Sequence, residues 1–141
     1  MKKITLLLIL VVGLFTIDSA YSQATKQLNF GFVGVSYDIP VATNIAIAPF
    51  ASTDWNFNHL TIGAKGNYWF DSLMGLSDPW DVYGGANLGY GIGMGNDNDG
   101  DFAFGLQVGG RWFWNEKWGL YLEIGGGSIG GTGGLGFTMK L

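Results

Sequence analysis

The chain has 141 residues, a formal net charge of −4 and no cysteine, and only 13% of its residues are charged, against about 25% in ordinary soluble domains. This length favours a single domain, and the acidic balance argues against nucleic-acid binding. The lack of cysteine excludes disulfides, thiolate catalysis, cysteine metal sites and a lipid-modified N-terminal cysteine. Aromatic residues make up 16% of the chain, and 25 residues are glycine.

The N-terminus has the pattern of an exported protein. Two lysines precede an apolar run over residues 4–17, and Ala20-Tyr21-Ser22 then places small residues at the two positions that a signal peptidase reads. We therefore expect a secretory signal peptide over residues 1–22, cleaved between Ser22 and Gln23. An uncleaved anchor is the alternative, although the apolar run is shorter than the ~20 residues of a membrane helix. Removal of two lysines and one aspartate with the signal changes the formal charge from −4 to −5.

After residue 22, apolar residues alternate with small or polar ones, and no helical periodicity is found. We expect strands over residues 28–37, 44–50, 59–70, 80–94, 102–114, 118–124 and 135–141. We expect the intervening connections at residues 38–43, 51–58, 71–79, 95–101, 115–117 and 125–134. Beside Gly34 the apolar residues switch from one face of the strand to the other, which indicates a β-bulge within the first strand.

Residues 102–124 show the alternation best, as two strands joined by the short turn at residues 115–117. One face is bulky and apolar, and the other is small or polar. If Trp114 pairs with Trp118, Gly109 lies opposite Glu123, and Arg111 is one diagonal step away, within reach of the Glu123 carboxylate.

A weakly charged, apolar chain without a helix-length apolar run fits a closed antiparallel barrel whose apolar face is outside. We expect an all-β, up-and-down transmembrane β-barrel over residues 23–141. Seven candidate strands are found, but bacterial single-chain barrels have an even number. We therefore expect eight strands, with the missing one within residues 23–58, and leave seven strands or an open sheet as alternatives.

The opposite face carries a few polar side chains among many glycines, which suit a narrow barrel interior. The expected interior polar network consists of Lys65, Asn87, Gln107, Arg111, Glu123 and Lys140, with Asn67 on the same face. We interpret it as a satisfied polar core that plugs the lumen, because buried charges need partners. An ion or small-solute path is the alternative.

Aromatic residues collect at strand ends that we expect on one rim of the barrel. The expected membrane-interface aromatics are Tyr68, Phe70, Trp80, Trp112, Trp114 and Trp118. With both termini on the periplasmic side, the turn at residues 115–117 is periplasmic, and the loops at residues 95–101 and 126–134 face outward. The 13 residues of a strand over 102–114 span roughly 28 Å at a tilt near 45°, about the height of the apolar band of such barrels.

These features together resemble the small outer-membrane β-barrel proteins of Gram-negative bacteria. The resemblance is carried by the signal sequence and by residues 81–90, 109–114, 118–125 and 134–141. It implies a non-enzymatic protein with a structural or surface-interaction role in the outer membrane. It also implies two partners, outer-membrane lipid and the barrel-assembly machinery, which reads the C-terminal strand. Family members usually close on an aromatic residue, whereas this chain closes on Leu141, with Phe137 four positions earlier.

No residue pattern predicts a catalytic, cofactor or metal site. The acidic loop at residues 95–101 resembles a calcium loop, but Gly95 and Leu106 occupy the first and last ligand positions of the EF-hand template. His59, the sole histidine, has no nucleophile motif around it. Two further alternatives stay open: a soluble exported barrel that binds an apolar ligand, as lipocalins do, and an outer-membrane lipid-modifying enzyme that uses His59.

Overall fold

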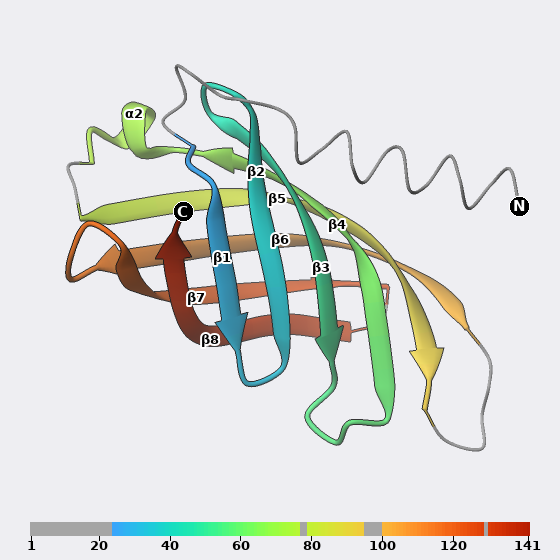
Figure 1. The fold of residues 1–141 in the computed structure, drawn as a ribbon. Helices are drawn as coiled ribbons and strands as arrows, with labels where there is room; N and C mark the ends of the chain where they lie inside the picture. Colours follow the sequence, from blue (N-terminus) through green and yellow to red (C-terminus); the bar gives the residue numbers. More distant parts are fainter. Residues whose placement is uncertain (1–23, 77–78, 95–99, 129) are drawn as a thin grey trace, which may run out of the picture.

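The computed structural model describes residues 24–76, 79–94, 100–128 and 130–141, which form a closed barrel of eight antiparallel strands in chain order (Figure 1). The strands are β1 Gln27–Gly31, β2 Gly34–Ala42, β3 Ile45–Thr53, β4 His59–Trp69, β5 Trp80–Gly93, β6 Asp101–Phe113, β7 Trp118–Gly127 and β8 Gly130–Lys140, and a one-turn helix, α2 Asp71–Met74, precedes β5. The predicted all-β, eight-stranded, up-and-down barrel is confirmed. The predicted signal peptide and residues 95–99 of the acidic loop lie outside the described residues.

The barrel closes where β1 pairs with both β2 and β8. We call the end that carries the start of β1, the end of β8 and α2 the terminal end (Figure 1). The opposite end, with the turn at residues 32–33 and the loop at residues 54–58, is the distal end. Most of the apolar residues that face outward lie between these two rims on β4 to β8, and β2 and β3 add Val35, Val41 and Ile45. Among the described residues, no helix is long and apolar enough to cross a membrane.

The missing strand lies within the segment that we read as one strand over residues 28–37. Gly31 pairs with Gly34, so Phe32 and Val33 form a two-residue hairpin turn instead of the expected bulge. Such turns usually place Gly or Asn at positive φ. Here the turn has neither residue, and Phe57 is the one non-glycine residue with positive φ in the described parts of the chain. The turn therefore carried no sequence signal.

The expected turn over residues 38–43 is wrong, because β2 continues through Pro40 to Ala42 and the chain reverses after it. The β2–β3 ladder pairs Ser36 with Phe50 and Ile39 with Ile47, and omits the two positions between them, one of which is Pro49. Proline has no N–H to give to a ladder, so the strands pass this point without regular pairing. Pro49 therefore interrupts the pairing between β2 and β3 without ending either strand.

The expected glycine-rich bend over residues 125–134 is also wrong. Gly125 pairs with Thr132 and Gly127 pairs with Gly130, so β7 and β8 extend almost to the tip of the hairpin. Glycine has a low intrinsic β-propensity, but the two long strands that flank this segment carry the pairing through it.

The expected register of β6 and β7 is confirmed. Gly109 lies opposite Glu123, and the Trp114 N–H donates to the Trp118 carbonyl over 3.2 Å. Because side chains alternate with period two, this register turns Arg111 and Glu123 toward the lumen and Trp112 toward the outside.

Candidate functional site

The half of the lumen near the terminal end is filled around Arg111. The guanidinium Nη2 donates to Asp38 Oδ2 over 2.5 Å, and both side chains are 1% exposed. The rings of Trp69 and Tyr83 cover the guanidinium at 4.9 and 4.2 Å from its central carbon. Burial of the Arg111 guanidinium is tolerated because its charge is paired with a carboxylate and lies against the faces of two aromatic rings.

Neutral amides extend this cluster across the barrel. Asp38 also accepts hydrogen bonds from Asn29 over 2.8 Å and from Asn67 over 3.3 Å. Gln107 donates to Asn67 over 2.8 Å, and Asn87 donates to Gln107 over 2.6 Å. A continuous chain of hydrogen bonds therefore runs from the ion pair toward the middle of the lumen.

A second ion pair lies nearer the middle of the barrel. Lys65 of β4 is paired with Glu123 of β7, and the Tyr83 hydroxyl donates to the other Glu123 oxygen over 2.9 Å. The Lys65 and Glu123 side chains are 16% and 11% exposed. Arg111 lies one diagonal step from Glu123, within reach of it, but does not form an ion pair with it. Glu123 instead forms an ion pair with Lys65 from across the lumen, and Arg111 forms one with Asp38.

Lys140 lies apart from both clusters, at the terminal end, with its ammonium 4.0 Å from the centre of the Phe113 ring. It interacts electrostatically with Asp81 of β5. The six residues of the expected interior network are thus divided among three places. Arg111, Gln107 and Asn87 belong to the first cluster, Lys65 and Glu123 to the second, and Lys140 to neither.

The side chains of the described residues do not fill the distal half of the lumen. It holds a cavity of about 520 Å³ that extends from Lys65, Tyr83 and Glu123 to the rim formed by Asp54 and His59. Our expectation of a lumen plugged throughout is therefore wrong for this half. Glycines on the inward face, such as Gly91 and Gly134, leave the space open because they have no side chain to occupy it.

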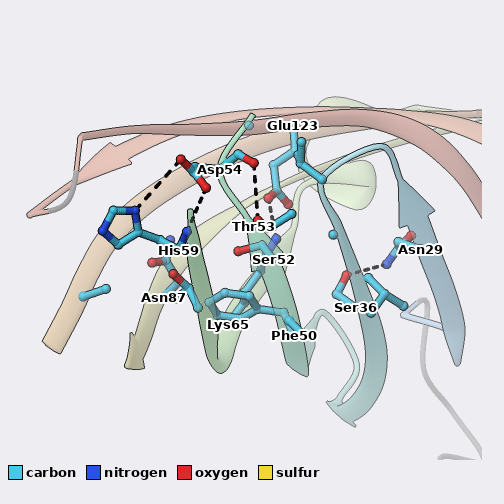
Figure 2. Close-up of a pocket in the computed structure, with 18 of the residues that line it drawn as sticks. Asn29, Ser36, Phe50, Ser52, Thr53, Asp54, His59, Lys65, Asn87 and Glu123 are labelled. Carbon is cyan, nitrogen blue, oxygen red and sulfur yellow. Dashed lines mark hydrogen bonds and ion pairs between the residues drawn. The ribbon is translucent and has the colours of Figure 1, made fainter. Parts of the chain in front are cut away.

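Figure 2 shows how this cavity is lined. Lys65 and Glu123 face each other, and the Phe50 ring lies beside Lys65, with its centre 5.3 Å from the ammonium. Neutral hydroxyl and amide groups make up most of the remaining polar lining, from Asn29, Ser36, Ser52, Thr53, Thr61, Asn87 and Tyr121.

Asp54 organises the loop at the mouth of the cavity. Its Oδ1 accepts hydrogen bonds from the backbone N–H groups of Asn58 and His59 over 2.6 and 2.9 Å. The bond from the His59 N–H is the largest influence that lowers the pKa of Asp54 from the ordinary value of 3.8. The His59 ring lies 3.9 Å from Asp54 Oδ2, and within the described ranges no hydroxyl group is hydrogen-bonded to it.

The six expected interface aromatics all lie at the terminal end. Trp80 pairs with Trp112 across β5 and β6, with ring centres 6.4 Å apart, and Trp112 and Trp114 are separated by the same distance. Tyr68 and Phe70 form a second contact at 5.1 Å. Trp118 contacts the Phe30 ring edge-on. Trp80, Trp112 and Trp114 are 53%, 39% and 46% exposed.

Sequence reasoning missed four residues of the filled half, Asn29, Asp38, Trp69 and Tyr83. Asp38 was assigned to a turn, although Ser36 and Asp38 alternate with Val35 and Tyr37, a pattern that continues the strand. Trp69 and Tyr83 fall on the inward face by strand alternation, but they were not included in the polar network, because a cation–π contact leaves no signal in a linear pattern.

Among the described residues, no group of three or more histidines or acidic residues is arranged to hold a metal ion. A scan against protein-family models, a search of curated proteins and a search of solved structures found no match to this chain.

Proposed function

We propose that this protein is a small integral β-barrel of the bacterial outer membrane with a structural or surface-interaction role and no catalytic activity. One observation carries the proposal: the distribution of polarity is the reverse of that in a soluble barrel. Outside, at mid-height, Leu88, Leu106 and Ile124 are 59%, 70% and 62% exposed. Inside, Arg111 with Asp38 and Lys65 with Glu123 form ion pairs shielded from solvent. Lipid is the solvent that suits such an exterior.

Two further features support the proposal. Three exposed tryptophans, Trp80, Trp112 and Trp114, form a band at the terminal end, where amphipathic rings suit the boundary between hydrocarbon and water. The 14 residues of β5 and the 13 residues of β6 exceed the 9–11 residues that a tilted strand needs to cross a bilayer. In this arrangement the terminal end faces the periplasm and the cavity faces the outside of the cell.

A soluble exported barrel that binds an apolar ligand is the second candidate, and the 520 Å³ cavity is the observation in its favour. It requires Trp112, Trp114 and Trp118 to be buried and the cavity wall to be apolar. The exposed Trp112 and Trp114, and the ion pair at the base of the cavity, count against it.

Membrane fractionation tests the proposal directly. We expect the protein to stay in the membrane fraction during a carbonate wash and to be extracted by detergent. The extracted protein should migrate differently on a gel before and after boiling, as a folded barrel does. Lipids that carry quenching groups near the headgroup should quench its tryptophan fluorescence. Release of the folded protein by carbonate would contradict membrane integration and favour the soluble candidate.

A further inference from the structure

The base of the cavity offers a donor and an acceptor side by side. Lys65 has three N–H donors, and within the described part of the chain one of them is used, for Glu123. Each Glu123 oxygen accepts one hydrogen bond, from Lys65 or from Tyr83, and each has room for another. Both residues line the cavity, so a ligand there can accept from an ammonium and donate to a carboxylate at neighbouring positions.

The wall above this pair is neutral and hydroxyl-rich. Ser36, Ser52 and Thr61 supply hydroxyl groups from β2, β3 and β4. The rings of Phe50 and Trp55 supply apolar faces on which C–H groups pack. Hydroxyl groups both donate and accept, so such a wall suits a ligand that also does both.

The charges of the cavity argue against ionic ligands. Lys65 and Glu123 already neutralise each other, and a ligand carboxylate or ammonium that paired with one of them would leave the other buried without its partner. The remaining carboxylates that line the mouth, Asp54 and Asp101, repel anions.

We propose that this cavity binds a neutral polyhydroxylated molecule of the size of a mono- or disaccharide. One ligand hydroxyl accepts from Lys65, a neighbouring hydroxyl donates to Glu123, and the C–H face of the ring packs against Phe50. A volume of about 520 Å³ lies within the range of small-molecule sites. The inference goes beyond the proposed function and is independent of it, because it rests on the lumen and not on the surroundings of the barrel.

The test uses the full chain, purified and folded in detergent, and titration calorimetry with separate probes. Glucose and maltose are the neutral probes, glucose 6-phosphate and glucuronate the anions, alanine the zwitterion and choline the cation. We expect saturable binding of a neutral sugar with a Kd of about 1 mM or below, and no saturation by the charged probes.

The matched variants change the same charges in two places. Lys65→Met with Glu123→Gln removes the pair at the base of the cavity while keeping its volume, and should weaken sugar binding about tenfold or more. Lys140→Met with Asp81→Asn makes an equivalent change at the terminal end, outside the cavity, and should leave the affinity unchanged. Phe50→Leu removes the stacking face, together with the ring contact to Lys65, but keeps both charges of the ion pair, so it tests the site even if the first variant fails to fold.

The proposal is overturned if no neutral sugar saturates the folded protein, or if a charged probe binds more tightly than the neutral sugars. The proposal is also overturned if the Phe50→Leu variant, or the Lys65→Met with Glu123→Gln variant, binds the neutral sugar as tightly as the wild type does. Membrane fractionation does not depend on any of these results, so failure here is distinguishable from failure of the proposed function.

Discussion

At the scale of single residues, the interior is organised by ion pairs whose partners come from strands on opposite sides of the barrel. Arg111 of β6 and Asp38 of β2 are separated by 73 positions in the chain, and Lys65 and Glu123 by 58. A buried charge that loses its partner cannot be rehydrated, so each pair holds two distant strands at a fixed position relative to each other.

Replacing Asp38 by Asn should show how strongly the terminal half depends on its pair. The variant leaves the Arg111 guanidinium buried without a carboxylate, and we expect a loss of about 3–5 kcal/mol in the free energy of unfolding. Urea unfolding of the folded protein, followed by tryptophan fluorescence, measures it. The double variant Asp38→Asn with Arg111→Met should lose less than the two single variants together. Strict additivity would show that the two groups are not coupled.

The loop at residues 54–58 should depend on the ionisation of Asp54. Hydrogen bonds to its carboxylate lower its pKa, so their contribution is complete above the ordinary value of 3.8 and is lost only as the pH falls through the lower folded value. We expect the amides of Asn58 and His59 to be protected from hydrogen exchange at every pH above the lowered pKa of Asp54. In Asp54→Ala they should exchange faster at every pH. Protection that disappears well above pH 3.8 would contradict this account.

At the scale of elements, glycines set how closely β4 and β5 approach on the inward face. A Cβ at Gly85 would lie 1.8 Å from the Gly66 carbonyl oxygen, a distance that no side chain allows. A Cβ at Gly66, on the outward face, would meet nothing within 4 Å. Glycine is therefore required at one position and merely present at the other.

The two glycines provide a matched pair of substitutions. Gly85→Ala should separate the backbones of β4 and β5 and cost about 1–3 kcal/mol, as overpacked sites do. Gly66→Ala should be neutral or slightly stabilising, because alanine restricts the unfolded chain more than glycine does. The fraction that migrates as folded barrel before boiling, measured against temperature, compares them. Equal losses in both variants would show that crowding is not the cause.

At the scale of the whole molecule, the closed barrel presents apolar side chains to its surroundings and keeps its ion pairs inside. Leu106 stands near the middle of β6 and is 70% exposed, whereas Met94 follows β5 at the distal rim and is 52% exposed. If the surroundings are lipid, the two positions lie at different depths, and the cost of a charge differs accordingly.

Leu106→Arg should cost about 2–4 kcal/mol for folding into lipid vesicles, because the guanidinium is placed near the bilayer midplane. Met94→Arg should cost about 1 kcal/mol or less at the interface. Denaturant titration in vesicles measures both variants. A soluble barrel predicts that neither substitution matters, so equal stability of the two variants and the wild type would count against membrane insertion.

Much of the barrel follows from the sequence because the side-chain period of a strand is local. Alternation over residues 102–124 was enough to predict the faces of β6 and β7 and the pairing of Gly109 with Glu123. The hairpin at Phe32 and Val33 was not predictable in this way, because its residues are not those that tight turns prefer. Its strand was recovered only from the even number that a closed barrel requires.

The sequence by itself determined which side chains face inward and where the aromatic residues gather. Only the tertiary structure decided which of the inward residues meet, and that the described side chains fill one half of the lumen and leave the other open. Pairing between neighbouring strands is fixed by register, but contacts across the lumen depend on closure and strand tilt, which place β2 opposite β6 and β4 opposite β7. The Arg111–Asp38 pair and the cavity above Lys65 and Glu123 therefore belong to the closed barrel and to no segment of the chain alone.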